Sequence, residues 1–275
     1  MTKFMAISAL MSLSLIATVS KADTLNVLGA SDLFSVLGAT TVTNTGPTHL
    51  AGDLGLSPGS SITGFGVGTT VGGTTHISDS LANTAQSNAA SGFTTLQGLS
   101  TTNTGLTTFS AVAYTPGVYD FSSSASLTGT LILDFQGLNN TSFVFNIGSA
   151  LTTASGSIVS IINEGTNDSV YWTVGSSATL GTTTSFQGNL IALQSITMNT
   201  GATIGCGNAI ALNGAVTLDT NTIGGSCNAG DSTGVPPTAS PVPEPASIGM
   251  LGMGLCGIAG TMWMRTRRIV GLARN

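Results

Sequence analysis

Three segments of the chain repeat one pattern: a threonine-rich strand, then a turn of small or glycine residues, then an apolar strand. They begin at Ala178, Ile196 and Val216, so their starts are 18 and then 20 residues apart. A period near 20 residues with the composition of strands is typical of a solenoid, in which each coil stacks on the next. Equivalent threonines should then form ladders with a spacing of about 4.7–4.9 Å. A flat, threonine-covered face is the feature most informative about function.

One internal segment departs from the strand pattern and predicts a helix. Between residues 78 and 99, apolar side chains recur at steps of three or four, the spacing of one helical face. They are Leu81, Ala85, Ala89, Phe93 and Leu96. Ser78 or Asp79 can cap the N-terminus. A single helix cannot bury this stripe alone, so we expect it to pack along one side of the solenoid.

Charge is scarce throughout the predicted body. Only 6% of residues are charged, and no Lys or Arg occurs between positions 22 and 264. A body without basic residues cannot neutralise phosphates, which excludes nucleic-acid binding and argues against nucleotide or phosphosugar chemistry.

An enzyme of the polysaccharide-cleaving solenoid kind would need paired acids. The candidates are Asp120, Asp134, Glu164, Asp168 and Asp219. None has a Lys, Arg or His nearby in sequence, and the two histidines, His49 and His76, are expected to be structural or on the surface. We therefore expect no catalytic residues, no metal and no cofactor.

Both ends of the chain carry targeting signals. Residues 1–22 have a basic start at Lys3, an apolar stretch and small residues before a cleavage point after Ala22, which predicts a secretory signal peptide. At the other end, Pro243, Glu244 and Pro245 precede an apolar run at residues 248–264 and a basic cluster. The run is at the short edge of what spans a bilayer. A first membrane helix at the N-terminus and a plain anchor at the C-terminus are the alternatives.

The C-terminal motif, apolar run and basic cluster together resemble the PEP-CTERM sorting signal of Gram-negative bacteria. The resemblance implies recognition by an exosortase, cleavage near the motif and transient anchoring in the inner membrane. The expected organisation is a signal peptide at 1–22, a solenoid domain at 23–228, a linker at 229–241, and a sorting signal at 242–275 with a transmembrane segment at 248–264.

Two of the three cysteines fall in the expected exported domain. Cys206 and Cys227 would close a loop of about 20 residues, and a disulfide is favoured outside the cytoplasm. Such a bridge would stabilise the last coils by about 3 kcal/mol. A metal site is the weaker interpretation, because no histidine cluster accompanies the cysteines.

Several segments between about residues 25 and 227 follow the order found in a known family. They are Thr41–Thr48, Gly52–Gly55, Thr63–Phe65, Gly72–Thr74, Pro116–Tyr119, Leu127–Leu131, Leu151–Ser155, Val174–Gly181 and Asn213–Ile223. With them the chain resembles the microbial ice-binding proteins. The resemblance implies a mainly β fold: a right-handed, discontinuous, triangular β-solenoid with one long α-helix packed along one side. In it, the N-terminal segment completes a coil out of sequence order.

Parts of that family carry a Thr-Ala/Gly-X-Thr/Asn motif on the ice-binding face. Thr45–Thr48 and Thr200–Thr203 match it fully, and four other segments match it in part. The resemblance therefore implies these ice-binding residues: Thr45, Thr48, Thr128, Thr130, Thr153, Ser155, Thr182, Thr184, Thr200, Thr203, Thr220 and Thr222.

The function expected from the resemblance is that of an exported protein that adsorbs to ice and inhibits ice growth and recrystallisation. Its partners would be ice or ordered water and the exosortase machinery, and its place would be outside the cell or at the surface of a Gram-negative bacterium. The alternative is a structural or adhesive protein of the cell surface or matrix, for which an extracellular polysaccharide would be a partner.

Overall fold

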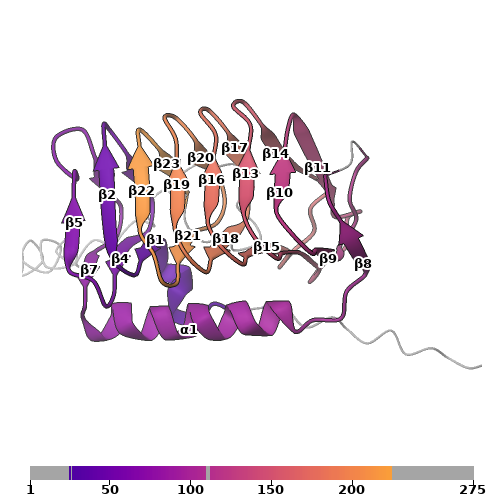
Figure 1. Cartoon of the computed structure of the whole chain (residues 1–275), viewed down its shortest axis with the longest axis horizontal. Coiled ribbons are helices and arrows are strands. Elements are labelled where there is room, and N and C mark those ends of the chain that lie inside the picture. The colour runs from indigo at the N-terminus through magenta and orange to yellow at the C-terminus, as the bar shows by residue number, and fades with distance from the viewer. Residues whose placement is uncertain (1–24, 26, 110–111, 225–275) are drawn as a thin grey trace, which may run out of the picture. The chain divides into compact units, whose positions relative to one another are not determined.

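The computed structural model describes residue 25, residues 27–109 and residues 112–224. These residues form three parallel β-sheets, a short 3-10 helix η1 (Gly29–Leu33) and one α-helix, α1 (Ser80–Gln97). Each coil of the chain contributes one strand to each sheet in turn, which makes the described part a three-sided β-solenoid (Figure 1).

The strands divide among sheets that we label A, B and C. Sheet A contains β1 (Phe34–Gly38), β4 (Asp53–Leu56), β7 (Thr75–Ile77), β8 (Asn103–Leu106), β9 (Gly117–Phe121), β12 (Ser142–Ile147), β15 (Ser169–Val174), β18 (Asn189–Ala192) and β21 (Ala209–Ala211). Sheet B contains β2 (Thr41–Thr45), β5 (Ser61–Thr63), β10 (Ala125–Leu127), β13 (Leu151–Thr153), β16 (Ala178–Leu180), β19 (Ile196–Met198) and β22 (Val216–Asp219). Sheet C contains β3 (His49–Leu50), β6 (Thr70–Val71), β11 (Thr130–Asp134), β14 (Ile158–Ile162), β17 (Ser185–Phe186), β20 (Thr203–Ile204) and β23 (Thr222–Ile223).

The order of coils in space differs from their order in the sequence. The last coil, β21–β22–β23, pairs in parallel with the first, β1–β2–β3, in all three sheets. In Figure 1 this appears as the orange strand β22 lying beside the indigo strand β2. The discontinuous solenoid that the family resemblance implies is thereby confirmed.

The strands of sheet B show why the repeats adopt this fold. In β16, β19 and β22 an apolar residue, a threonine and an apolar residue follow one another, and both apolar side chains of each triplet are buried. Successive side chains of a strand point to opposite faces, so the central threonine faces outward. Threonine is β-branched and suits such a pleated, half-buried surface.

Aromatic residues fill one part of the core. Tyr119, Phe145 and Trp172 occupy register-matched positions in sheet A, and the Phe145 and Trp172 ring centroids are 4.2 Å apart with nearly parallel planes. These coils are longer, because the three residues lie 26 and 27 positions apart in the sequence. The buried indole of Trp172 donates to the Gln187 carbonyl at 2.9 Å, so its one polar group is satisfied.

Helix α1 covers the outer face of sheet A. Its buried residues include Ala85, Ala89, Phe93 and Leu96, as the predicted stripe requires. They pack against Val144, Tyr171, Ile191 and Ile210 on the outer face of the sheet. An 18-residue helix is about 27 Å long, which is between five and six strand spacings. The helix thus covers most of the eight spacings between β7 and β8, the two end strands of sheet A that it connects in the chain (Figure 1).

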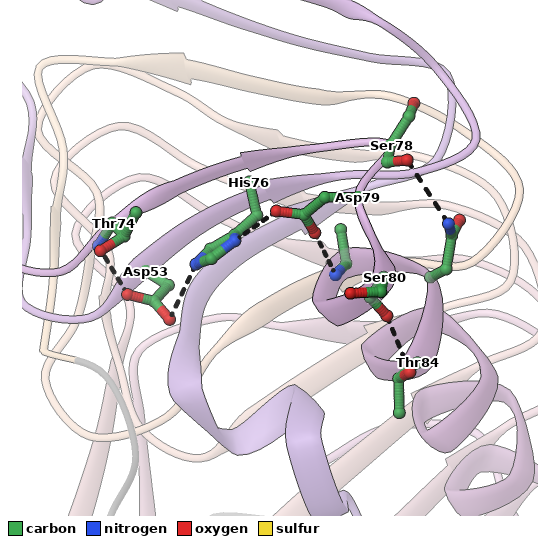
Figure 2. Close-up of polar contacts among 9 residues, drawn as sticks. Asp53, Thr74, His76, Ser78, Asp79, Ser80 and Thr84 are labelled. Atoms are coloured by element: carbon green, nitrogen blue, oxygen red, sulfur yellow. Dashed lines mark hydrogen bonds and ion pairs between the residues drawn. The ribbon is translucent and has the colours of Figure 1, made fainter.

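Asp79 is the N-cap of the helix, and its side chain accepts the backbone N–H of Ala82 at 2.9 Å. The His76 imidazole lies beside it, with Nδ1 2.6 Å from Asp79 Oδ2 and Nε2 3.7 Å from Asp53 Oδ2 (Figure 2). Asp53 also accepts the Thr74 backbone N–H at 2.6 Å. This cluster joins the helix start to two strands of sheet A, and it assigns His76 the structural role expected from the sequence.

The corner between sheets B and C is built from left-handed residues. In each coil, a single residue in the turn that follows the sheet B strand has a positive φ between 56° and 84°. These residues are Gly64, Gly46, Thr220, Gly201, Thr183, Gly156 and Gly129. Glycine tolerates this conformation without penalty. The glycine in the Thr-Gly-X-Thr segments at 45–48 and 200–203 is thus the residue that turns the corner.

Several expectations concern residues outside the described part of the chain. These are the signal peptide at 1–22, Cys227 and with it the disulfide to Cys206, the linker at 229–241 and the sorting signal at 242–275. Among the residues that the structure describes, no helix has the length and apolarity needed to cross a membrane. The domain boundaries and the disulfide therefore stay predictions.

We expect the substitution Thr183→Gly to stabilise the fold. A non-glycine residue in the left-handed region costs about 1–2 kcal/mol, whereas the added freedom of glycine in the unfolded chain costs about 0.5–1 kcal/mol. The free energy of unfolding should thus rise by up to about 1.5 kcal/mol, measured by denaturant titration. The matched control is Thr182→Gly, one residue earlier and outside the positive-φ set, which should lose stability. Equal losses in both variants would contradict this account of the corner.

The stability of the helix start should depend on pH through Asp79. The Ala82 backbone N–H, together with the neighbouring His76, holds the pKa of the Asp79 carboxyl below its ordinary value of 3.8. A group whose pKa is lowered on folding contributes stability above the ordinary pKa, and that stability is lost as the pH falls through the lower value. The stability margin of the wild type over Asp79→Asn should therefore be full at pH 5 and shrink towards pH 2, followed by chemical unfolding. A margin that stays constant would refute the ionic role of this cap.

Candidate functional site

Sheet A offers no free face for a large ligand, because α1 lies against its outer side. Val144, Tyr171, Ile191 and Ile210 are all nearly or fully buried there. Only sheets B and C present open outer faces among the described residues, so the functional surface has to be sought on these two.

The outer face of sheet C is chemically mixed. Its register-matched outward row runs from β11 to β6 as Thr130, Ile158, Ser185, Thr203, Thr222, His49 and Thr70. Ile158 is 42% exposed and interrupts the hydroxyl row. His49 adds an ionisable ring, whose Nδ1 lies 2.7 Å from the Thr70 hydroxyl. This face lacks a regular repeat of one side chain.

The outer face of sheet B carries one uninterrupted ladder of hydroxyl side chains. Its seven rungs occupy register-matched outward positions of successive strands from β10 to β5. They are Ser126, Thr152, Thr179, Thr197, Thr217, Thr43 and Thr63. Six strand spacings of about 4.8 Å give the ladder a length of about 29 Å. We call this set the threonine ladder.

The threonine ladder is continuous across the junction between the end and the beginning of the described chain. Thr217 belongs to the last coil and Thr43 to the first, yet they are direct register partners. Their Oγ1 atoms lie 3.4 Å apart. The two N-terminal rungs therefore extend the same surface as the five contributed by later coils.

Beside the ladder, at the corner with sheet A, small serines tie adjacent coils together. Ser124 accepts the Ala150 N–H at 3.3 Å, Ser177 accepts the Ser195 N–H at 3.3 Å, and Ser195 accepts the Ala215 N–H at 3.2 Å. These side chains are short and satisfied by the backbone of the next coil. They keep the border of the ladder low and rigid.

The strands of sheet B hold no basic or aromatic residue, and Asp219 is their single ionisable residue. Long cations and bulky rings, which would break a flat surface, are thus missing from it. The surface presents the methyl and hydroxyl groups of its threonines at a regular spacing, and it is suited to contact an extended, uncharged partner with a regular repeat.

Three of the twelve site residues expected from the resemblance lie inside the protein. Thr48, Thr153 and Thr184 are at most 3% exposed. The hydroxyls of Thr153 and Thr184 bond to each other at 2.7 Å, and that of Thr48 donates to Asn44 Oδ1 at 2.6 Å. The expectation that they lie on an open face is wrong, since they brace the corner between sheets B and C from within.

The other nine expected residues are at least partly exposed but do not form one row. Six lie at the B–C corner, namely Thr45, Thr128, Ser155, Thr182, Thr200 and Thr220. Thr130, Thr203 and Thr222 lie on the outer face of sheet C. The motif therefore marks the corner, and its last position has already turned onto the next sheet or into the core.

The rungs of the threonine ladder were absent from that set. The signal that could have found them is the triplet of apolar residue, threonine and apolar residue in each repeat, which places the middle side chain on the open face. Outside the three C-terminal repeats the pattern is less visible, since Ser126 replaces the threonine and Thr153 replaces the second apolar residue.

The acids considered for catalysis hold turns together where the structure records their contacts. Asp134 accepts the Gln136 N–H at 2.8 Å and the Asn163 amide at 2.9 Å. Asp168 is 8% exposed and accepts the backbone N–H groups of Thr141 and Gly165. Among the described residues, no group of three His, Cys, Asp or Glu side chains is placed to hold a metal ion.

Comparison with known proteins identifies two matching families. The model of the ice-binding-like family matches residues 36–224. The model of the PEP-CTERM protein-sorting motif matches residues 241–268, as the resemblance at the C-terminus led us to expect.

Individual relatives agree with the first match. An ice-binding protein of Nostoc sp. (strain HG1) is 45% identical over 269 residues, which is 97% of each chain. The crystal structure of an ice-binding protein from an Antarctic biological consortium is 40% identical, covers 74% of this chain and 92% of its own, and superposes with a TM-score of 0.69. That of an ice-binding protein from the Antarctic ascomycete Antarctomyces psychrotrophicus is 37% identical, covers 71% and 96%, and has a TM-score of 0.66. The chain belongs to the ice-binding-like family.

Proposed function

We propose that this protein binds ice through the outer face of sheet B and thereby restrains ice growth and recrystallisation. The observation that carries the proposal is the threonine ladder, seven register-matched hydroxyl side chains on strands whose single ionisable residue is Asp219. Membership of the ice-binding-like family supports it. The other two faces are less suitable, because a helix covers sheet A and the outward row of sheet C is chemically mixed. Sheet B is therefore favoured as the contact surface.

The mechanism follows from the chemistry of threonine. Ice offers no charge, so adhesion must come from matching an ordered water lattice over many weak contacts. The threonine hydroxyl both donates and accepts hydrogen bonds, while its methyl group is apolar. Rungs held at the spacing of a β-sheet can order a layer of water, and each water-mediated contact costs little. A stiff surface loses little conformational entropy on docking, which makes coil stacking part of the binding mechanism.

The corner threonines adjoin this surface. Thr45 is the last residue of β2 and pairs in register with Asp219, one outward position beyond the Thr43 and Thr217 rungs. We infer that exposed corner residues, Thr45 and Thr200 among them, extend the contact along one border. The expected residues on sheet C are, under this proposal, outside the surface.

Outward-facing Thr197 and Thr203 belong to the same coil and allow a matched test. Thr197→Tyr places a bulky ring in the middle of the threonine ladder, and most of the thermal hysteresis should be lost because the ring keeps the neighbouring rungs away from ice. Thr203→Tyr places the same ring on sheet C and should leave hysteresis unchanged. Melting temperatures of both variants check the fold.

A third variant separates stability from ice contact. Thr184→Val removes a buried hydroxyl that bonds to Thr153 and should lower the free energy of unfolding by about 1–3 kcal/mol, with hysteresis near 0 °C kept. The proposal fails if the wild type shows no partitioning into ice, or if Thr197→Tyr keeps full hysteresis while Thr203→Tyr loses it.

We further propose that the chain is exported and held at the inner membrane until an exosortase cleaves it near Pro243–Pro245. The match of residues 241–268 to the sorting motif supports this, as do the apolar run at 248–264 and the basic residues after it. The proposed limits are those expected from the sequence, with the binding domain at 23–228 and a linker at 229–241. A polysaccharide partner finds no support in sheet B, whose strands contain no aromatic residue for stacking on sugars.

Sorting can be tested on the full chain in a host that possesses an exosortase. Glu244→Ala should leave the tail uncleaved, so that a larger product accumulates in the membrane fraction, whereas the wild type appears trimmed. Glu164→Ala, inside the folded body, serves as the control for a lost carboxylate. Identical processing of the wild type and Glu244→Ala would contradict the role assigned to the motif.

A further inference from the structure

Asp219 is an exception to the uncharged composition of sheet B. It is the last residue of β22 and the one ionisable residue in the strands of this sheet. It stands at the corner where the chain leaves sheet B, in the outward row next to the threonine ladder. A carboxylate is unexpected on the proposed ice-binding surface, because the other side chains in the strands of sheet B are neutral.

The carboxylate accepts hydrogen bonds from hydroxyl groups of its own coil and of the preceding coil. Its Oδ2 accepts the hydroxyl of Thr200, which belongs to the preceding coil. Its Oδ1 accepts the hydroxyl of Thr220 at 3.0 Å. In the following coil, Thr45 is its register partner. Three of the exposed corner threonines expected to contact ice thus surround one acid.

The backbone fixes the carboxylate in this place. The Asp219 N–H donates to Asn221 Oδ1 at 2.6 Å, and its carbonyl accepts the Gly201 N–H at 3.1 Å. The Thr220 N–H donates to the Thr45 carbonyl at 2.9 Å. Gly46 leaves room for the cluster, because a Cβ there would lie 2.4 Å from Thr220 Oγ1. The acid is therefore held between coils on both sides.

Two hydroxyl groups that donate to a carboxylate lose their rotational freedom. An ionised carboxylate accepts hydrogen bonds and donates none, so the protons of Thr200 and Thr220 point towards it. The lone pairs of both hydroxyl oxygens are then left for water outside. Bonds to a charged acceptor are stronger than those between neutral groups, which keeps this arrangement in place before any ligand arrives.

We propose that Asp219 is a positioning residue of the ice-binding surface: it orients the hydroxyls of Thr200 and Thr220 so that the corner presents a fixed row of acceptors to the ordered water layer. This inference rests on the proposed function and assigns to that surface a residue outside the ladder. The acid acts through its threonines, and contact between the carboxylate and ice is not required.

The test compares five purified forms of the protein by thermal hysteresis: wild type, Asp219→Ala, Asp219→Asn, Thr200→Val and the double variant Asp219→Ala/Thr200→Val. Asp219→Ala should lower hysteresis roughly twofold, because the hydroxyls become free to rotate. Asp219→Asn keeps one acceptor oxygen and should fall between Asp219→Ala and the wild type. The double variant should lose clearly less than the product of the two single losses, because both changes act on one hydrogen bond.

Three outcomes would overturn the inference: full or increased hysteresis in Asp219→Ala, equal losses in Asp219→Asn and Asp219→Ala, or single losses that multiply in the double variant. A purely structural role would lower the melting temperature of these variants without such coupling in hysteresis.

Thr197→Tyr separates the two proposals. If it loses activity while Asp219→Ala keeps it, the ladder stands and the positioning role falls, whereas an inactive wild type removes both.

Discussion

Everything that this protein presents to its surroundings depends on one interaction, the parallel pairing of each coil with the next in a fixed register. The pairing sets the spacing of the outward side chains and decides which of them face outward at all. A shift by one residue would exchange the two faces of a strand. In β19, for instance, it would bury Thr197 and expose Ile196 and Met198. The apolar residues on either side of each rung therefore specify the surface as firmly as the threonines themselves.

Rigidity comes from several small devices that act between neighbouring coils. Serines at one border of sheet B accept backbone N–H groups of the next coil, and buried threonines such as Thr153 and Thr184 brace the opposite corner. Helix α1 closes sheet A along most of its length and carries the chain back to its other end. Stacked aromatic rings fill the longer coils. None of these features belongs to the threonine ladder itself, yet together they keep the outer face of sheet B flat and uniform.

Much of the fold could be predicted from the sequence, because period, composition and helical stripe all report on local backbone geometry. The helix and the repeated coils were expected from these patterns, the out-of-order N-terminal coil was expected from the resemblance to the microbial ice-binding proteins, and all three are present. The functional residues were predicted less well. The Thr-Gly-X-Thr segments hold the left-handed residue that turns a corner, and their last threonine lies on sheet C at Thr203 or inside the protein at Thr48. Which side of a corner a residue occupies depends on one extra or missing residue in the turn, and such a difference becomes visible only when coils are superimposed in space.

The place where the first and last coils meet has a consequence for biosynthesis. Two of the seven rungs, Thr43 and Thr63, are made early in translation. Thr43 pairs with Thr217 of β22, which leaves the ribosome near the end of the domain, and Thr63 joins the ladder through Thr43. A chain that ends before β22 has four contiguous rungs, Ser126, Thr152, Thr179 and Thr197, and no rung joins them to Thr43 and Thr63. The seven-rung surface thus exists only once the last coil has joined the first.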